Sequence, residues 1–397
     1  MPVDYQQVYA KIKEIGAKVS ERKKTLEERR ARARALLTAN ADALQALARI
    51  VESARAADPN TRCALPLNER LDAHVPPTAL PPSATLIAAD GSQVNPDRHN
   101  QVQYGLVNVG AIVLKLNSGE APTLFTDSEL LFDEELLSPS GNPLTEGMVA
   151  LRRDLKERGK LEELAKNYPA PVVTFTDGPI ELWGAKDGED ANAYEESLKN
   201  YLSVLSRLQE RGVITAGYVD KPGADLVVRL LELVDAAEKG LFEGIRDYHP
   251  LRGVTDRWLF GDKNAPMLGP GERSAVFAFQ SKSDRFYKGV LALHFFYLNA
   301  GTPGRPWIVR VEMPRWVVDD PQKINLLHAV LVDQCRVMGA KPYPYLLHRA
   351  HETAVVSLDE KTQVEQMLLR ELRSGGEEMD EGSYKQSAKD RPGRKSY

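Results

Sequence analysis

Two aspartates each follow an apolar segment with the composition of a β-strand, and each is followed by glycine. Asp90 ends the run 85–90, and Asp177 comes directly after the run 171–176. In open α/β sheets, ligands collect beyond the carboxyl ends of the strands. Converging carboxylates repel each other unless a cation lies between them, and hard oxygen ligands select Mg²⁺ or Mn²⁺. The two Asp-Gly pairs therefore predict a divalent-metal site, with the glycines allowing sharp turns and close approach of a substrate.

Asp-Gly is also one of the commonest turn dipeptides, so each pair alone indicates no more than a turn. A third carboxylate is expected from the helix predicted over residues 145–167, where Asp154 and Glu157 lie three positions apart on one face. Glu157 is favoured because Leu161 and Leu164 follow it on the inner side of that helix. Asp154 is the reserve, and a solvated surface charge is the alternative for either acid.

A second group of polar residues lies in the segment Tyr343-Pro-Tyr-Leu-Leu-His-Arg-Ala-His351-Glu352. Histidine can bind a metal or carry a proton near neutral pH, and tyrosine can orient water or a phosphate oxygen. His348 and His351 compete for this role because they lie three residues apart. An isolated histidine is more often structural than catalytic, so this segment alone does not identify a catalytic residue.

The apolar periodicity around these residues predicts a definite order of elements. Strands are expected at 85–90, 102–117, 123–131, 171–176 and 213–219, and helices at 145–167, 192–211 and 224–237. Three consecutive strands with short connections form an antiparallel meander, whereas strands that return through helices are parallel. This is the order of an RNase H-like α/β fold, a mixed sheet with flanking helices, although other α/β folds share parts of it. In that order the first and fourth strands are neighbours, so Asp90 and Asp177 would converge.

The flanking regions complete the expected domain organisation. Residues 5–57 have the composition of one long helix or a helical hairpin, and the proline-rich stretch 59–82 suggests a linker. Further strands are expected at 274–280, 290–297 and 307–312, and helices at 321–338 and 360–373. We therefore expect an N-terminal helical segment and linker over 1–75, a catalytic domain over 84–374 whose core covers about 84–240, with a C-terminal α+β extension, and a disordered polar tail over 375–397.

Composition limits the class of protein. The chain has 397 residues and a net charge of −4, which weakly disfavours nucleic acid as a partner. Basic clusters at 22–34 and 385–395 could still bind phosphate, or could be a solvated helix face and a disordered end. Cys63 and Cys335 are the only cysteines, which argues against a disulfide framework and a thiolate zinc site and favours a reducing cytoplasm. No apolar run suits a membrane span or signal peptide.

Five motifs, in order along the chain, resemble those of the NurA nucleases over about 85–372. They are Ala-Asp90-Gly-Ser, Thr-Asp177-Gly-Pro, Gly-Tyr218-Val-Asp-Lys, Arg310-Val-Glu-Met-Pro-Arg-Trp and the segment 343–352. The N-terminal helical region lies outside this resemblance.

The resemblance implies an RNase H-like core, a Mn²⁺-dependent nuclease acting on DNA, and a homodimer. It also implies a hexameric ATPase partner, HerA, which moves DNA ends toward the nuclease for resection during double-strand break repair. Asp90 and Asp177 match the two metal-binding aspartates, His351 matches the C-terminal active-site histidine, which we also take as a metal ligand, and Tyr343 matches the tyrosine upstream of it. The helix glutamate of the family matches Glu157, but Asp154 can be aligned with it as well.

The expected activity is 5′–3′ exonuclease or single-strand endonuclease cleavage of DNA, with Mn²⁺ as the cofactor and Mg²⁺ as the second candidate. One alternative is an inactive scaffold of the same fold that binds DNA ends, which metal-dependent cleavage would distinguish. A second is a kinase related to the sugar and acetate kinases. No second glycine follows Gly91 closely enough to form a phosphate-binding loop, which argues against the kinase.

Overall fold

The computed structural model describes residues 4–138, 141–184, 191–339 and 341–376, and internal contacts divide the chain into two units. Unit 1 comprises Met1–Ala79 and Tyr218–Pro342, and unit 2 comprises Leu80–Gly217 and Tyr343–Tyr397. Each unit therefore combines two separate stretches of chain. The N-terminal helices group with the strands of the second half, whereas the sequence alone suggested a separate N-terminal segment.

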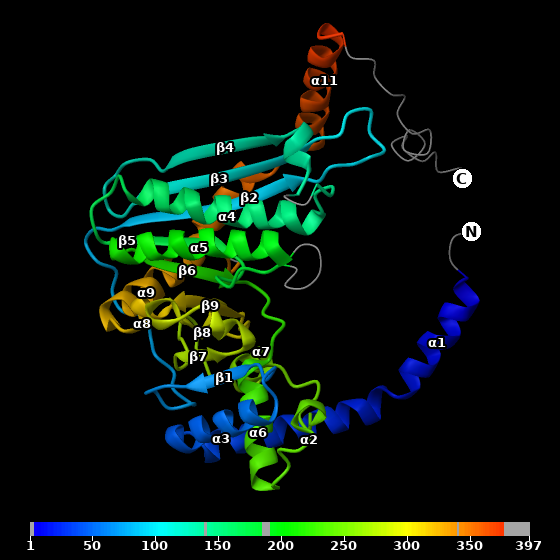
Figure 1. The fold of residues 1–397 in the computed structure, drawn as a ribbon. Helices are drawn as coiled ribbons and strands as arrows, with labels where there is room; N and C mark the ends of the chain where they lie inside the picture. Colours follow the sequence, from blue (N-terminus) through cyan, green and yellow to red (C-terminus); the bar gives the residue numbers. More distant parts are fainter. Residues whose placement is uncertain (1–3, 139–140, 185–190, 340, 377–397) are drawn as a thin grey trace. The chain divides into compact units, whose positions relative to one another are not determined.

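Unit 2 is built on a mixed sheet (Figure 1). Its strands are β2 (Thr85–Val94), β3 (Gly105–Lys115), β4 (Thr123–Leu131), β5 (Val172–Asp177) and β6 (Ile214–Val219), most of which belongs to this unit. They lie in the order β6-β5-β2-β3-β4, in which β2, β3 and β4 form an antiparallel meander and β5 pairs in parallel with β2. The meander and the parallel fourth strand confirm the predicted RNase H-like arrangement.

Four helices accompany this sheet: α4 (Glu146–Ala165), α5 (Ala191–Glu210), α10 (Tyr345–Ala354) and α11 (Leu358–Ser374). A Cβ atom at Gly91 would meet side chains of α4, and one at Gly110 would meet the backbone of α10. Gly110 is paired with Asp90, and successive residues of a strand face opposite sides of a sheet. Helices α4 and α10 therefore cover opposite faces, which explains why β3 is buried along most of its length.

Unit 1 contains a second group of strands and most of the helices. Its strands β1 (Cys63–Pro66), β7 (Phe277–Gln280), β8 (Leu293–Asn299) and β9 (Ile308–Pro314) lie in that order and pair antiparallel. Its helices are α1 (Tyr5–Ala17), α2 (Val19–Ala39), α3 (Leu44–Ala57), α6 (Leu226–Glu238), α7 (Asp256–Gly261), α8 (Arg315–Val318) and α9 (Pro321–Val337). Two stacked ring pairs, Phe260 with Tyr297 and Phe277 with Phe295, form part of its core, and Phe295 and Tyr297 join them edge to face.

Three sequence expectations need correction. The region 5–57 forms three helices rather than one or two, with breaks at Lys18 and at 40–43. The stretch 59–82 contains β1, so it is not only a linker. Strand β2 does not end at Asp90 but continues to Val94, because Gly91 to Val94 stay paired with β3.

Several arginines of the basic cluster at 22–34 form hydrogen bonds and ion pairs with other residues of unit 1. Arg29 donates a 2.6 Å hydrogen bond to the carbonyl oxygen of Arg252, Arg32 pairs with the buried Asp235, and Arg34 lies 2.5 Å from Asp262. The second cluster, at 385–395, lies outside the described residues.

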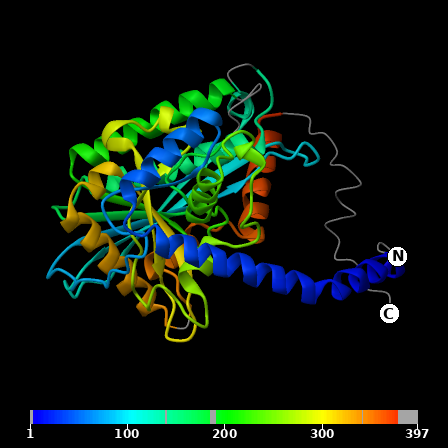
Figure 2. The ribbon, with the colours of Figure 1, turned by 90° about the horizontal axis from the view of Figure 1, so that it is seen from below.

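Helix α1 differs from the other N-terminal helices because none of its residues is buried. Figure 2 shows it extending beyond the end of α2. Both cysteines are buried and unpaired. In the described parts of the chain, no helix combines the length and the apolar character needed to cross a membrane.

Candidate active site

The register between β2 and β5 brings the two predicted aspartates to the same level of the sheet. Their parallel pairing runs as far as Ala89 with Thr176, and the next residues on the two strands are Asp90 and Asp177. Neighbouring strands lie about 4.8 Å apart, and residues at matched positions face the same side. The structure therefore places the two carboxylates side by side. Asp90 is partly buried, and Asp177 is exposed.

Helix α10 brings a histidine onto Asp90. The Nδ1 atom of His351 lies 2.7 Å from Oδ2 of Asp90, and the backbone N–H of Gly91 donates to Oδ1 at 2.9 Å. A carboxylate can only accept, so the imidazole donates its Nδ1–H and leaves Nε2 as the other ring nitrogen. His348 instead lies 3.5 Å from Glu352 on the same helix. Of the two candidate histidines, the structure places His351 beside the carboxylates.

A cavity of about 360 Å³ collects all four candidate acids. The cavity is lined by Asp90, Asp154, Glu157 and Asp177. Asp154 and Glu157 therefore both remain candidates for the helix acid. Glu157 is the more deeply buried of that pair, with 9% of its side chain exposed against 31% for Asp154. Tyr343, by contrast, is partly buried two residues before α10 and is not one of the residues that line this cavity.

Charges in the cavity act strongly on one another. Burial raises the pKa of Glu157 well above its usual value, and the negative charges of Asp154 and Asp90 raise it further. Burial also raises the pKa of Asp154, against the opposing effect of Arg153. The guanidinium of Arg153 lies 2.7 Å from Oδ1 of Asp154 and 3.3 Å from Oε1 of Glu157. Arg153 thus compensates part of the repulsion between these acids.

The donor chemistry of the cavity fits a hard divalent cation. Carboxylate oxygens are the ligands that Mg²⁺ and Mn²⁺ prefer, and the mutual repulsion that raises the pKa of Glu157 is what a cation would relieve. As the described side chains stand, no three His, Cys, Asp or Glu residues gather tightly enough to enclose an ion. Two of the acids are instead engaged by Arg153.

The glycines that follow the two aspartates, Gly91 and Gly178, have different structural roles. Gly178 adopts φ of +83°, a left-handed conformation that suits the turn predicted after Asp177. Gly91 lies within β2 and makes no turn. A Cβ atom at Gly91 would lie 2.5 Å from Oε1 of Glu157 and 2.6 Å from Cγ of Arg153. A side chain at 91 would therefore require Glu157 and Arg153 of α4 to move. The expectation of a sharp turn at Gly91 is wrong, because this glycine lies in the strand.

Arg158 is a residue of this site that the sequence reasoning missed. It lines the cavity and is 2% exposed. Its Nη1 donates to Oγ1 of Thr215 at 3.1 Å, and its Nη2 donates to Oγ1 of Thr176 at 2.7 Å. Its Nε is buried without a hydrogen-bond partner among the described residues. Burying a charged group among hydroxyls costs free energy. The sequence contains no signal for this, because an arginine in a helix is usually exposed to solvent.

Two other motifs of the resemblance, those that contain Tyr218 and Arg310, lie in unit 1, where their residues contact other residues of that unit. Arg310 and Glu312 form a buried ion pair at 2.8 Å. The hydroxyl of Tyr218 donates to the carbonyl oxygen of Pro342 at 3.3 Å. These contacts stabilise unit 1 and place neither motif in the cavity described above.

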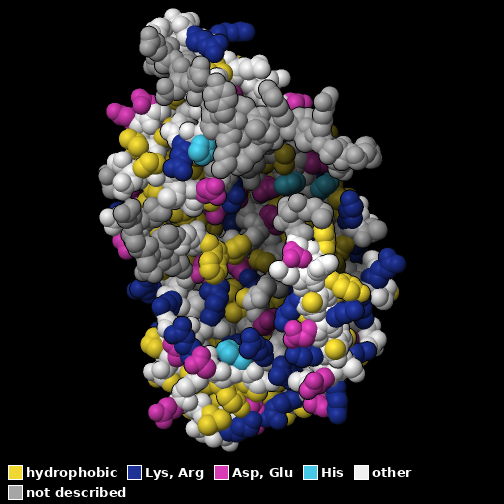
Figure 3. Space-filling view, turned by 90° about the vertical axis from the view of Figure 1, so that its right-hand side faces the viewer, with side chains coloured by type: hydrophobic (Ala, Val, Ile, Leu, Met, Phe, Trp, Pro, Cys, Tyr) yellow, Lys and Arg dark blue, Asp and Glu magenta, His cyan; other side chains and the backbone are white. Residues whose placement is uncertain are grey.

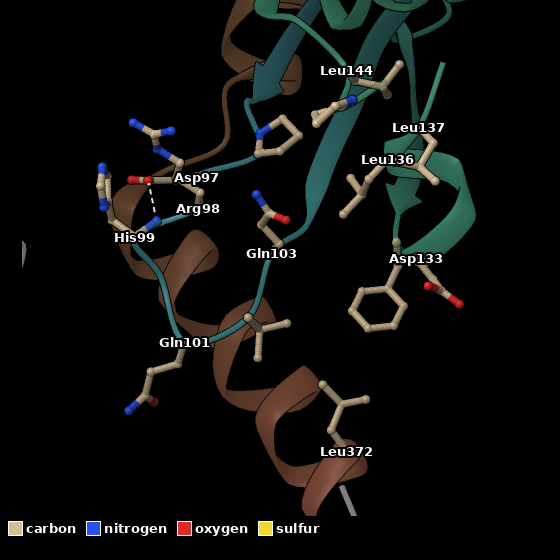
Figure 4. A pocket seen from close by; sticks show the side chains of 14 residues that line it. Asp97, Arg98, His99, Gln101, Gln103, Asp133, Leu136, Leu137, Leu144 and Leu372 are labelled. Atoms are coloured by element: carbon tan, nitrogen blue, oxygen red, sulfur yellow. Dashed lines mark hydrogen bonds between the residues drawn. The ribbon is translucent and has the colours of Figure 1, made fainter. Parts of the chain in front are cut away.

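A larger cavity of about 710 Å³ lies elsewhere in unit 2 (Figure 4). Asp97, Arg98 and His99 lie on one side of it, and the apolar residues Leu136 and Leu144 lie on the other. The hydrogen bond drawn in it joins the backbone N–H of His99 to Asp97 at 2.9 Å. It contains none of the candidate residues, so its size does not make it the active site.

Comparisons with solved structures give distant similarities. The NurA nuclease from Sulfolobus solfataricus is 10% identical, with 93% of this chain and 98% of that chain covered and a TM-score of 0.49. The catalytic domain of human endonuclease V is 13% identical, covering 71% of this chain and 83% of that chain with a TM-score of 0.30. LC9-RNase H1, a type 1 RNase H with the type 2 active-site motif, is 13% identical over 41% of this chain and 75% of that chain, with a TM-score of 0.21.

No curated protein matches the sequence. The family model of the NurA domain matches residues 84–356, which is well over half of the chain and includes the strands and helices that carry Asp90, Glu157, Asp177 and His351. The chain therefore belongs to the NurA family of nucleases.

Proposed function

We propose that this chain is a metal-dependent deoxyribonuclease that acts on DNA ends, as a 5′–3′ exonuclease, a single-strand endonuclease or both. The observation that carries the proposal is the placement of Asp90 beside Asp177 and in hydrogen-bond contact with His351, above a cavity that Glu157 also lines. Asp90, Glu157, Asp177 and His351 would hold the cation, with Asp154 as the alternative helix acid. Mn²⁺ is the proposed ion because an imidazole ligand favours it over Mg²⁺.

When bound, a divalent cation supplies charge neutralisation at the phosphate and a lower pKa for the attacking water. The chain's own residues supply the positioning. Asp90 fixes the tautomer of His351 by accepting its Nδ1–H, so Nε2 is the atom that can bind the cation or exchange a proton with water. Tyr343 is retained as a candidate for orienting a phosphate oxygen, on the strength of its motif alone.

Arg158 provides positive charge where the phosphodiester would enter. Its guanidinium lines the same cavity as the acids, and its hydrogen bonds go to hydroxyl and carbonyl oxygens rather than to carboxylates. A guanidinium so placed can pair with a non-bridging phosphate oxygen. We include Arg158 as a phosphate-binding residue of the proposed nuclease.

A direct assay tests the activity. End-labelled single-stranded and double-stranded DNA is incubated with the full chain and Mn²⁺, Mg²⁺ or a chelator, with Asp90→Asn as the matched inactive control. We expect cleavage with Mn²⁺ that the chelator abolishes. DNA binding without cleavage under any of these ions would favour the alternative, an inactive scaffold that holds DNA ends.

We further propose that the protein is a homodimer and works in double-strand break repair with a hexameric ATPase of the HerA type. The support for self-association is the exposed apolar surface of α1, where Tyr5, Tyr9 and Ile12 are 69%, 59% and 55% exposed. Light scattering at micromolar concentration should give the mass of a dimer. The double variant Ile12→Glu, Ile15→Glu should give a monomer, and an unchanged mass would remove α1 from the interface.

A further inference from the structure

Unit 1 contains a pocket that combines tryptophan rings with basic side chains and is separate from the cavity of the candidate acids. Its volume is about 490 Å³, within the range of about 300–1,000 Å³ typical of ligand pockets. Trp258 and Trp307 line it, together with four cationic residues: Arg30, Lys221, Arg257 and Lys263. We call this the Trp258–Trp307 pocket. In the lower part of Figure 3, Lys and Arg side chains lie among Asp and Glu side chains on the face drawn there.

Trp307 is held in place while remaining accessible. Its indole Nε1 donates to Oδ1 of Asp220 at 2.8 Å, which fixes the orientation of the ring. The Nζ atom of Lys221 lies 5.5 Å from the ring centroid, which is a cation–π contact. The residue is 36% exposed although it lines a pocket. A fixed, accessible indole is suited to stacking against another flat ring.

The cations of the pocket divide into engaged and available groups. Arg30 and Arg34 stack on Trp258 with guanidinium-to-centroid distances of 4.7 and 4.6 Å. Arg30 also pairs with Glu27 at 2.7 Å, and Arg34 pairs with Asp262. These contacts fix the wall that carries Trp258. They leave Arg257 and Lys263, and Lys221 apart from its contact with Trp307, as charges at the pocket available to an anion.

The ion pairs of the described residues leave these three cations unmatched. None of Lys221, Arg257 and Lys263 forms an ion pair with a carboxylate there, although the charge of Arg257 acts on Asp225. The two carboxylates that line the pocket, Asp220 and Asp262, are already used by Trp307 and Arg34. A ligand that satisfies the pocket should therefore carry negative charge.

We propose that the Trp258–Trp307 pocket binds single-stranded DNA, with a base stacked on Trp307 and the flanking phosphates on Lys221, Arg257 and Lys263. Single-strand binding sites combine these two elements, aromatic platforms for bases and cations for the backbone. Duplex DNA keeps its base faces stacked inside the helix and could use only the cations. An acidic peptide would likewise leave Trp307 without a role. The inference rests on the proposed action on DNA and adds a strand preference to it.

The test measures binding without cleavage. The full chain is titrated in chelator with fluorescently labelled dT20 and with a duplex of the same length, and anisotropy gives the affinities. Trp307→Ala should weaken binding of dT20 by roughly 5- to 150-fold, the range expected for one lost base stack. It should change duplex affinity less than about twofold, and Trp307→Phe should restore most of the single-strand affinity.

The charges are tested by salt dependence. Lys221→Gln and Arg257→Gln should each lower the slope of log K against log salt for dT20 by about 0.7, the value for one phosphate contact on a single strand. Lys288→Gln is the matched control, because Lys288 is exposed in unit 1 and does not line the pocket. Thermal melting of each variant confirms that it folds.

Two results would overturn the proposal: dT20 affinity of Trp307→Ala within twofold of the wild type, or equal losses for dT20 and duplex. Loss of dT20 affinity in Lys221→Gln and Arg257→Gln but not in Trp307→Ala, with polyglutamate displacing dT20 from the wild type, would assign the pocket to an acidic protein segment instead, because such a segment uses only the cations. Cleavage assays on the wild type test the proposed nuclease activity independently of the proposed DNA-binding pocket. Binding that depends on Trp307, without cleavage, would support the pocket and reject the nuclease activity. Cleavage together with binding that does not depend on Trp307 would support the nuclease activity and reject the pocket.

Discussion

Gly110 on β3 is the cross-strand partner of Asp90 on β2, and its lack of a side chain lets α10 lie directly against the strand pair. A Cβ atom at Gly110 would lie 2.5 Å from the carbonyl oxygen of Ala350 and 2.5 Å from the backbone nitrogen of Ala354. The contact is to backbone, so no side-chain movement can relieve it. The approach of α10 that brings His351 onto Asp90 therefore depends on glycine at this position.

We expect Gly110→Ala to displace α10 and to reduce cleavage by at least about tenfold, since small misplacements at an active site are costly. Gly105→Ala is the matched control on the same strand, because its Cβ would meet side-chain atoms and no backbone, with Leu131 at 3.3 and 3.4 Å and Pro96 at 3.5 Å. Cleavage rates and melting temperatures of both variants check this. Full activity in Gly110→Ala would show that the position of α10 does not matter.

Asp90→Asn and Asp177→Asn should each reduce cleavage more than about 100-fold, because each removes a proposed metal ligand. The fold should survive, since neither side chain belongs to the apolar core. Removing one of two neighbouring negative charges should raise the melting temperature in chelator. Asp97→Asn is the control in unit 2. Near wild-type cleavage with an unchanged metal optimum in either variant would refute the assignment.

Glu157→Gln should distinguish between the two helix acids. The pKa of Glu157 is raised in the folded protein, so the folded state binds more protons than the unfolded state above the ordinary carboxyl pKa. The free energy of unfolding therefore falls as pH rises from that value through the raised pKa. In chelator, the stabilisation given by Glu157→Gln should grow as pH rises through this window. Asp154→Asn should show a smaller gain, and cleavage should fall more in Glu157→Gln.

His351→Ala should lose Mn²⁺-supported cleavage by at least about tenfold more than His348→Ala. The reason is the contact of His351 with Asp90, whereas His348 faces Glu352 on its own helix. Imidazole favours Mn²⁺ over Mg²⁺, so the preference for Mn²⁺ should also shrink in His351→Ala. Initial rates over titrations of both ions measure this. Equal losses in the two variants would rule the assignment out.

Much of unit 2 was predictable because its elements have strong local signals. The strand expected at 123–131 is β4 with the same bounds, and the strand expected from the apolar run 171–176 is β5, which covers Val172–Asp177. Helix α10 has buried residues at helical spacing, Leu346, Leu347, Ala350 and Ala354, but it is short and follows two prolines. Its length is below that at which periodicity alone identifies a helix.

Other features depend on partners that are distant in sequence. Gly91 and Ser92 look like a turn, yet β3 holds them in a strand through Val109 and Asn108. Arg158 could not be distinguished from a solvated helix residue, because the hydroxyls that surround it come from β5 and β6. The grouping of the N-terminal helices with 218–342 likewise rests on contacts between separate stretches of chain.

Unit 2 is discontinuous, and this sets an order of events during translation. Its first stretch ends at Gly217, and its second begins at Tyr343, after the intervening residues of unit 1. Ribosomes add roughly 5–20 residues per second, so α10 emerges about 6–25 s after the sheet that it covers. During that interval Asp90, Glu157 and Asp177 exist without His351. A nascent chain therefore contains the three acids without the histidine that contacts Asp90 until α10 has been made.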